Sequence, residues 1–123
     1  MKQFYPMKTT FSLIFLLLVQ LGQAQMKTKS ITSLSEDQLG SILLVDVRTP
    51  TEFNAGHLKN AENINWMGDT FAKQFEAISK DQPVYVYCKV GGRSYKAAEW
   101  LLANGYKNVT NLSGGYDAYL SKK

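Results

Sequence analysis

The chain has 123 residues, 45% of them hydrophobic and 20% charged, so it is long enough for one compact domain and too apolar for a disordered protein. Its net charge of +4 is scattered, with no basic block interleaved with aromatic residues, so we expect no nucleic-acid binding. A single Cys and a single His do not supply the usual zinc ligands, and we expect neither a metal nor a cofactor.

Residues 1–24 have the pattern of a cleavable signal peptide. Lys2 and Lys8 precede the uncharged run FSLIFLLLVQL (residues 11–21), and the small residues Gly22 and Ala24 fit a cut after Ala24. The run is shorter than the roughly 18–20 residues that cross a bilayer as a helix. The sequence therefore predicts a leader at 1–24, a domain at 25–123 and no stable membrane association after cleavage.

Two features of the leader leave alternatives open. Uncharged residues extend from 9 to 25, so an uncleaved anchor is the alternative to cleavage, and MKTTFSLIF would be a complete leader beginning at Met7. We expect an exported protein, periplasmic if the source is a Gram-negative bacterium. In an oxidising compartment the single Cys88 cannot form an internal disulfide, so an unpaired thiol there indicates either catalysis or full burial.

Helix and strand signals alternate after residue 25. SLSE (33–36) fits a capping box that opens a short helix through residue 39. The continuous aliphatic run ILLVDV (42–47) is typical of a strand covered on both faces. TPTEFNAG (49–56) predicts a short helix, with Pro50 in its first turn and Gly56 at its end.

The second half of the chain continues this alternation. Short runs predict three further strands: AENIN (61–65), PVYVYC (83–88) and NVTNL (108–112). Three further helices are predicted: GDTFAKQFEAISK (68–80), SYKAAEWLLANGY (94–106) and GGYDAYLSKK (114–123). We expect Asp69 to cap the first of these and Gly105 to stop the second. The alternation predicts an α/β fold whose parallel sheet is covered on both faces.

Polar clusters follow three of the predicted strands. Asp46 and Arg48 come after the first, residues 88–93 after the PVYVY strand, and Gly114-Gly115 after the last. Because ligands of such sheets bind outside the carboxyl ends of the strands, we expect the three clusters to converge there.

The segment CKVGGRS (88–94) has the chemistry of an anion cradle. Gly91 and Gly92 permit positive φ, so backbone N–H groups can point inward, and the following helix adds partial positive charge. Both effects should lower the pKa of the Cys88 thiol below its free value of about 8.5. Lys89 and Arg93 add cations for an anionic substrate. The alternative is a buried structural cysteine before an ordinary glycine turn.

Three segments resemble the signatures of the rhodanese-type sulfurtransferases. DVRTPTEFNAGHLKNAENIN (46–65) resembles their first signature, CKVGGRS their active loop and NLSGGYDAY (111–119) their closing signature. The resemblance covers nearly all of the chain after the leader, in the expected order. Among subtypes, the chain is most similar in kind to single-domain periplasmic rhodaneses of the phage-shock type.

The resemblance implies a three-layer α/β/α domain with a five-stranded, mainly parallel sheet, and a Cys88 thiolate that accepts sulfur. This thiolate would attack the sulfane sulfur of a donor such as thiosulfate, releasing sulfite, and cyanide, a thiol or a protein acceptor would then remove the sulfur from the resulting persulfide. The active loop implied for substrate binding comprises Lys89, Val90, Gly91, Gly92, Arg93 and Ser94.

Loop length bears on a rival function. Four residues separate Cys88 from Arg93, whereas the phosphatases and arsenate reductases to which this family is related have one residue more, which makes room for a tetrahedral oxyanion. The shorter cradle favours a single sulfur atom over phosphate or arsenate.

Other residues receive supporting roles. The resemblance implies that Asp46 and Arg48 brace the active loop by ion pairing rather than by touching substrate. We interpret His57 as a packing or hydrogen-bonding residue, because a low-pKa thiolate needs no general base. Trp66 and Met67 are expected in the core, the alternative being a pocket rim. Tyr119 stands where the family often has Trp.

Two functions of other classes stay open beside the enzyme. One is a non-catalytic binding or regulatory module, which the intact cysteine and the basic loop disfavour. The other is a persulfide carrier or thiol sensor that hands sulfur to a partner protein, which differs from the enzyme only in its acceptor.

Overall fold

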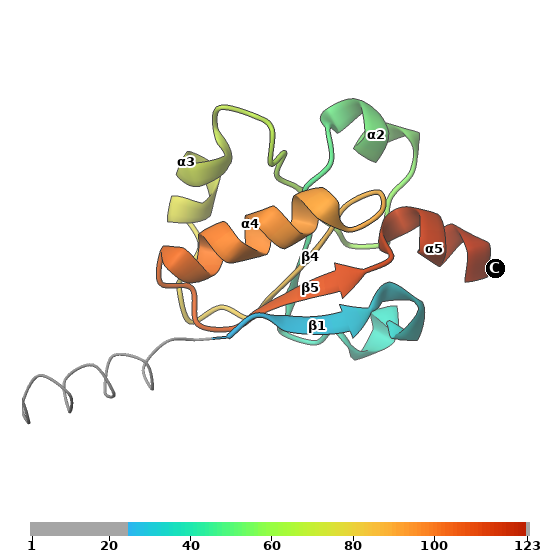
Figure 1. Cartoon of the computed structure of the whole chain (residues 1–123), viewed down its shortest axis with the longest axis horizontal. Helices are drawn as coiled ribbons and strands as arrows, with labels where there is room; N and C mark the ends of the chain where they lie inside the picture. The colour runs from blue at the N-terminus through green and yellow to red at the C-terminus, as the bar shows by residue number, and fades with distance from the viewer. Residues whose placement is uncertain (1–24, 123) are drawn as a thin grey trace, which may run out of the picture.

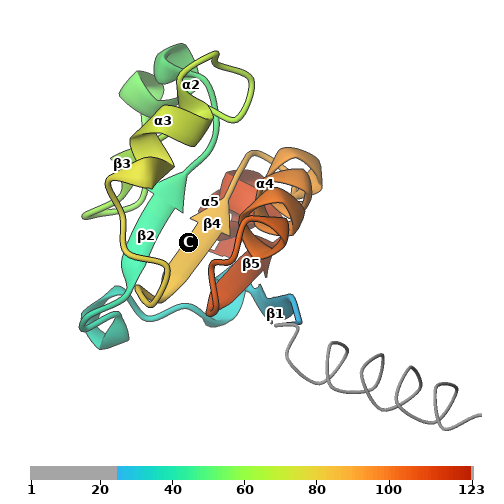
Figure 2. The same cartoon turned by 90° about the vertical axis from the view of Figure 1, so that its left-hand side faces the viewer.

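The computed structural model describes residues 25–122, so the predicted leader, both candidate start residues and Lys123 lie outside the described residues. Five strands form one sheet in the order β1-β5-β4-β2-β3, and every pair is parallel. The strands are β1 (Lys27–Ser30), β2 (Leu43–Asp46), β3 (Glu62–Asn63), β4 (Val84–Tyr87) and β5 (Val109–Ser113). The arrows of β1 and β5 point the same way in Figure 1, and those of β2 and β4 do so in Figure 2. The predicted five-stranded parallel sheet is confirmed.

In residues 25–122, four α-helices and two 3-10 turns lie between the strands or, in the case of α5, after the last one. They are η1 (Ile31–Ser33), η2 (Glu36–Gln38), α2 (Pro50–Ala55), α3 (Phe71–Glu76), α4 (Gly92–Ala103) and α5 (Gly115–Lys122). Pro50 occupies the first turn of α2 and Gly56 follows its last residue, as predicted. Gly105, with φ of 91°, lies just past the end of α4, also as predicted. Within residues 25–122 no helix is long and apolar enough to cross a membrane.

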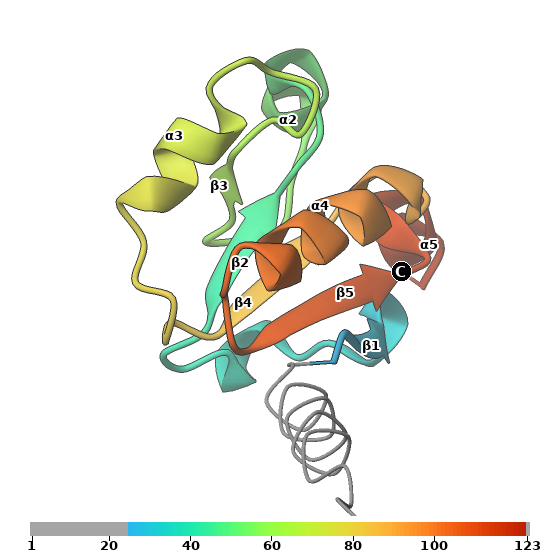
Figure 3. The ribbon, with the colours of Figure 1, turned by 60° about the vertical axis from the view of Figure 1, so that its left-hand side comes forward.

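The sheet separates two apolar cores, because successive side chains of a strand point to opposite faces. Val45 of β2 and Val86 of β4 belong to the core beneath α3 and α4. Leu44 and Tyr87 belong to the core that also holds Leu34 and Leu39 and is flanked by α5. Figure 3 shows α4 lying across the strands on its side of the sheet. The continuous aliphatic run of β2 therefore reflects a strand buried on both faces, as predicted.

Local capping differs from the prediction in two places. Ser33 does not cap η2: its hydroxyl donates to the carbonyl of Ser30, and the residue before η2 is Ser35. Thr70, not Asp69, precedes α3, and it makes no side-chain cap bond. A capping box is present at α2 instead, where the Thr49 hydroxyl accepts from the Glu52 N–H and the Glu52 carboxylate accepts from the Thr49 N–H.

Candidate active site

Three chain segments meet at the carboxyl edge of the sheet. The register pairs Asp46 at the end of β2 with Tyr87 at the end of β4, and β5 ends beside them. The backbone N–H of Tyr116, which follows Gly114 and Gly115, donates to the carbonyl of Cys88 at 2.8 Å. The predicted convergence of the polar clusters is thus what the parallel register produces.

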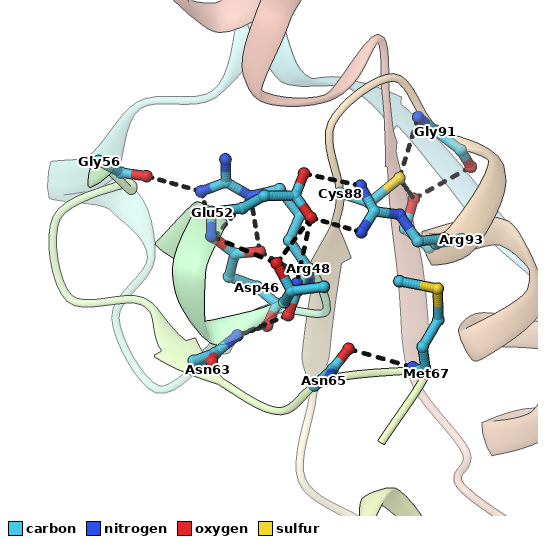
Figure 4. A network of polar contacts seen from close by, with 12 residues as sticks. Asp46, Arg48, Glu52, Gly56, Asn63, Asn65, Met67, Cys88, Gly91 and Arg93 are labelled. Carbon is cyan, nitrogen blue, oxygen red and sulfur yellow. Dashed lines mark hydrogen bonds and ion pairs between the residues drawn. The ribbon is translucent and has the colours of Figure 1, made fainter. Parts of the chain in front are cut away.

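The Cys88 thiol lies at the bottom of a loop between β4 and α4, with 1% of the residue exposed. Its Sγ accepts from the Gly91 N–H at 3.0 Å and lies 3.3 Å from the Ser94 hydroxyl oxygen (Figure 4). Burial alone would raise the pKa of this thiol. The Ser94 hydroxyl and the N–H groups of Ser94, Gly91 and Val90 outweigh burial and lower that pKa below its ordinary value.

Gly91 gives the loop its shape. Its φ of 122° lies in the region that L side chains rarely adopt, and it stands immediately before the first residue of α4. The helix begins at Gly92, two residues earlier than predicted, so its unpaired N–H groups and positive dipole end lie at the thiol. A thiolate at Cys88 is therefore stabilised by backbone groups that need no reorganisation.

Both cations of the loop are engaged by carboxylates. Arg93 makes a bidentate pair with Glu52, with N–O distances of 2.7 and 2.9 Å. Lys89 contacts Asp117 at 2.6 Å, and these two side chains are 55% and 47% exposed. We expected Lys89 and Arg93 to hold an anionic substrate. In the structure each of them is already in contact with a carboxylate.

Glu52, like Asp117, is a partner of the loop cations that the sequence prediction missed. Its carboxylate accepts from Arg93 and from the Thr49 hydroxyl, at 2.7 and 3.0 Å. The Arg93 guanidinium lowers the pKa of Glu52 to about 2, against the smaller opposing effect of burial. The Thr-x-x-Glu spacing of Thr49 and Glu52 signals a capping box, but nothing in the sequence shows that Arg93 is its second partner.

A second arginine–carboxylate pair lies deeper at the same edge. Arg48 contacts Asp46 at 2.6 Å, with side-chain exposures of 5% and 0%. Arg48 also donates to the carbonyl of Gly56 at 2.7 Å, and its guanidinium lies over the Tyr116 ring at 4.5 Å. The Asn63 amide donates to the carbonyls of both Asp46 and Arg48. Among the residues described, these contacts join β2 to β3, to Gly56 at the end of α2 and to α5. None of them reaches residues 88–94, so the bracing of the active loop stays a prediction.

The first turn of α5 forms backbone hydrogen bonds with the active loop. The Asp117 N–H donates to the carbonyl of Lys89 at 3.1 Å, alongside the bond from Tyr116 to Cys88. A Cβ at Gly115 would stand 2.3 Å from the Lys89 carbonyl oxygen, and the φ of Gly115 is 67°. Only glycine permits this approach, which explains Gly115 of the closing signature.

The remaining candidates lie around the site. The His57 ring stacks on Phe53 at 3.7 Å and its Nδ1 bonds the Phe53 carbonyl, so the contacts found are packing and hydrogen bonding. Trp66 packs edge-on against Phe71 beside the core, as expected, but Met67 does not, being 62% exposed. Figure 4 shows the Met67 side chain on the Arg93 side of the cradle. The Tyr119 hydroxyl bonds Glu36 at 3.0 Å.

Comparison with known proteins agrees with this geometry. Residues 30–122 match the Rhodanese-like domain. The thiosulfate sulfurtransferase GlpE of Tolumonas auensis is 35% identical over 82 residues, which are 67% of this chain and 76% of that protein. The tRNA uridine(34) hydroxylase of Photorhabdus laumondii is 37% identical over 86 residues, 65% of this chain but only 24% of that protein.

A solved rhodanese-like domain protein from Staphylococcus aureus superposes with a TM-score of 0.63 at 32% identity, over 77% of this chain and 90% of that one. The resemblance of the three sequence signatures is therefore confirmed, while the phage-shock subtype stays a prediction. The chain belongs to the rhodanese-like family of sulfurtransferase domains.

Proposed function

We propose that the protein transfers sulfane sulfur from thiosulfate, or a similar small anionic donor, through a persulfide on Cys88 to a thiophilic acceptor. The observation that carries the proposal is the Cys88 sulfur, held by the Gly91 N–H and the Ser94 hydroxyl at the start of α4. A thiol with a lowered pKa in such a place is a nucleophile that needs no separate general base.

The first step is a displacement at sulfur. The Cys88 thiolate forms a bond to the sulfane sulfur of thiosulfate, the S–S bond of the donor breaks, and its electron pair leaves with sulfite. Cys88 then carries a persulfide anion, which the N–H groups of the loop stabilise as they did the thiolate. In the second step cyanide or a thiol attacks the outer sulfur, and the Cys88 thiolate leaves.

Ser94 can follow the change of charge on the sulfur. In the structure its hydroxyl lies 3.1 Å from the carbonyl of Gly91, to which it donates, while the Cys88 thiol donates to the Ser94 oxygen. When the thiol ionises, the same hydroxyl can rotate and donate to the thiolate. Ser94 would therefore stabilise both the thiolate and the persulfide.

Thiocyanate formation from thiosulfate and cyanide tests this proposal. We expect the mature protein, residues 25–123, to turn over and Cys88→Ser to have no activity above background. A wild-type protein that forms no thiocyanate, with mercaptopyruvate or organic thiosulfonates also inactive as donors, would contradict the proposal. Activity with one of those donors instead would change only the identity of the donor.

The alternative to an enzyme with a small acceptor is a persulfide carrier that hands its sulfur to a partner protein. Val90, two residues after Cys88, is 67% exposed, and Met67 is 62% exposed, so the mouth of the cradle has apolar side chains that suit a protein partner. Single-turnover loading without steady-state turnover on small thiols would favour the carrier. Multiple turnovers with a small thiol would favour the enzyme.

We also propose that the protein is exported, with cleavage after Ala24, because residues 1–24 have the pattern of a cleavable leader. N-terminal sequencing of the protein recovered from the periplasmic or culture fraction tests this. A first residue of Gln25 is expected, and a retained leader in the membrane fraction would support the anchor instead.

A further inference from the structure

The charge around Cys88 differs from what the loop sequence alone indicates. The loop carries two cations, yet each of them contacts a carboxylate, Arg93 with Glu52 and Lys89 with Asp117. A donor with two negative charges, such as thiosulfate, must therefore compete with a carboxylate for either cation. A donor with less negative charge depends less on these cations, so this competition affects it less.

The two pairs are not equally strong competitors. Lys89 and Asp117 are 55% and 47% exposed, so water screens their attraction and the pair opens at little cost. Arg93 and Glu52 are 23% and 28% exposed and form two parallel bonds. The Glu52 carboxylate is further fixed by the Thr49 hydroxyl at 3.0 Å. Of the two cations, Arg93 is therefore bound more firmly by its carboxylate and is less available to a donor.

Arg93 also precedes Ser94, whose hydroxyl oxygen lies 3.3 Å from the reacting sulfur. A charge on Cys88 contributes to raising the pKa of Arg93, after the larger effects of the Glu52 bonds and burial. Figure 4 shows the guanidinium lying between the Glu52 carboxylate and the Cys88 sulfur. The exposed apolar side chains of Val90 and Met67 offer contact for an organic substituent in place of a sulfonate oxygen.

On the basis of the sulfur transfer proposed above, we propose that Glu52 is a specificity-determining residue. It holds Arg93 in an ion pair, and the site thereby favours monoanionic organic thiosulfonates over dianionic thiosulfate. Glu52 acts through Arg93 and touches no reacting atom, so its role is one of positioning. Removing its charge releases Arg93 for the sulfonate group of thiosulfate.

Thiosulfate and methanethiosulfonate are suitable probes, since they differ by a methyl group in place of one charged oxygen. With either donor the Cys88 thiolate bonds the terminal sulfur and the donor S–S bond breaks. The leaving electron pair goes to sulfite in one case and to methanesulfinate in the other. Because the two donors differ in intrinsic reactivity, the ratio of their kcat/KM values is compared between variants, with cyanide as the acceptor.

Glu52→Gln removes the charge but keeps an oxygen for the Thr49 cap. We expect it to raise the thiosulfate-to-methanethiosulfonate ratio about five- to tenfold, roughly the worth of one charge-assisted contact at a partly exposed site. The gain should come from a lower KM for thiosulfate, with kcat within about twofold of wild type. Glu52→Ala, a second variant that frees Arg93, should shift the ratio the same way.

Two matched variants separate this role from general effects. Asp117→Asn changes the net charge by the same amount as Glu52→Gln and frees Lys89 instead. Thr49→Ala removes the α2 cap but leaves the Glu52 carboxylate in place. We expect both to leave the ratio within about twofold of wild type. In an Arg93→Gln background, Glu52→Gln should no longer change the ratio.

The outcomes are distinct. A ratio that rises in Glu52→Gln but not in Asp117→Asn supports the proposal. An unchanged ratio in both Glu52 variants, or an equal rise in Asp117→Asn, overturns it while sulfur transfer through Cys88 stands. Wild-type protein that takes sulfur from neither donor instead overturns the proposed function itself.

Discussion

Two arginine–carboxylate pairs lie at the same edge of the sheet and differ mainly in their contact with water. Asp46 and Arg48 have side-chain exposures of 0% and 5%, whereas Glu52 and Arg93 have exposures of 28% and 23%. Two charges in a nearly dry position depend on each other, because neither can turn to water. Two charges at the surface can exchange partners. The inner pair therefore belongs to the architecture, and the outer pair can take part in recognition.

The largest difference should appear when one arginine is removed. Arg48→Met leaves the buried Asp46 carboxylate without its ion partner, and we expect the free energy of unfolding to fall by about 3–5 kcal/mol. Arg93→Met, its surface counterpart, should cost less than about 1 kcal/mol. Urea unfolding measures both. Equal losses for the two variants would erase the distinction drawn between the pairs.

Gly115 connects the inner pair to the loop, since Arg48 lies over the ring of Tyr116, the next residue. Gly115→Ala places a Cβ 2.3 Å from the Lys89 carbonyl oxygen, and backbone cannot yield as a flexible side chain would. We expect a loss of at least about 2 kcal/mol of unfolding free energy together with most of the sulfur transfer.

Gly40→Ala is the matched control for that substitution. Gly40 has a φ of 55° and no atom within 4 Å of an added Cβ, so only the backbone penalty of about 1 kcal/mol applies. Activity should stay unchanged in this variant. If Gly40→Ala were as damaging as Gly115→Ala, backbone strain rather than the contact with the loop would explain both.

Ser94→Ala tests how much the Ser94 hydroxyl, rather than either arginine, stabilises the Cys88 thiolate. Burial opposes ionisation of Cys88, and the Ser94 hydroxyl is the largest of the groups that favour it. Its removal should raise the pKa of Cys88, so the midpoint of iodoacetamide labelling moves to higher pH. At a pH below the midpoint, Ser94→Ala should be labelled several-fold more slowly than wild type, because less of its Cys88 is thiolate. An unmoved midpoint would leave the backbone N–H groups alone responsible.

The smallest effect concerns the outer pair and pH. Because the folded-state pKa of Glu52 is lowered from 4.5 to about 2, its stabilisation is fully present above about pH 4.5 and is lost as pH falls through about 2. The stability difference between wild type and Glu52→Gln should be under about 1 kcal/mol at neutral pH and shrink below pH 4.5. A difference that grew on acidification would have the wrong sign.

Much of the fold could be predicted because its signals are local. Three elements carry a signal within or next to their own residues. These signals are the aliphatic run of β2, Pro50 at the start of α2 and Gly105 after α4. β1 was not predicted from its own residues, since Lys27 and Lys29 give it no apolar pattern. As an edge strand it is defined by pairing with β5, more than 80 residues away in the chain.

The site divides in the same way. Cys88, Gly91 and Ser94 lie within seven residues of the chain, so the local sequence indicated an anion cradle, with a buried structural cysteine as the alternative. The partners of the cations could not be predicted, because Glu52 and Asp117 lie 41 and 28 residues from Arg93 and Lys89. Composition shows how many charges a chain has, and only the fold shows which of them meet.

Mass spectrometry of the protein after brief exposure to thiosulfate or methanethiosulfonate tests the central claim most directly. We expect the wild-type protein to gain one sulfur atom, located on the peptide that contains Cys88, and to lose it again on addition of cyanide. Cys88→Ser should gain nothing. A wild-type protein that stays unmodified by both donors, or a Cys88→Ser variant that gains the same mass, would contradict a persulfide on Cys88.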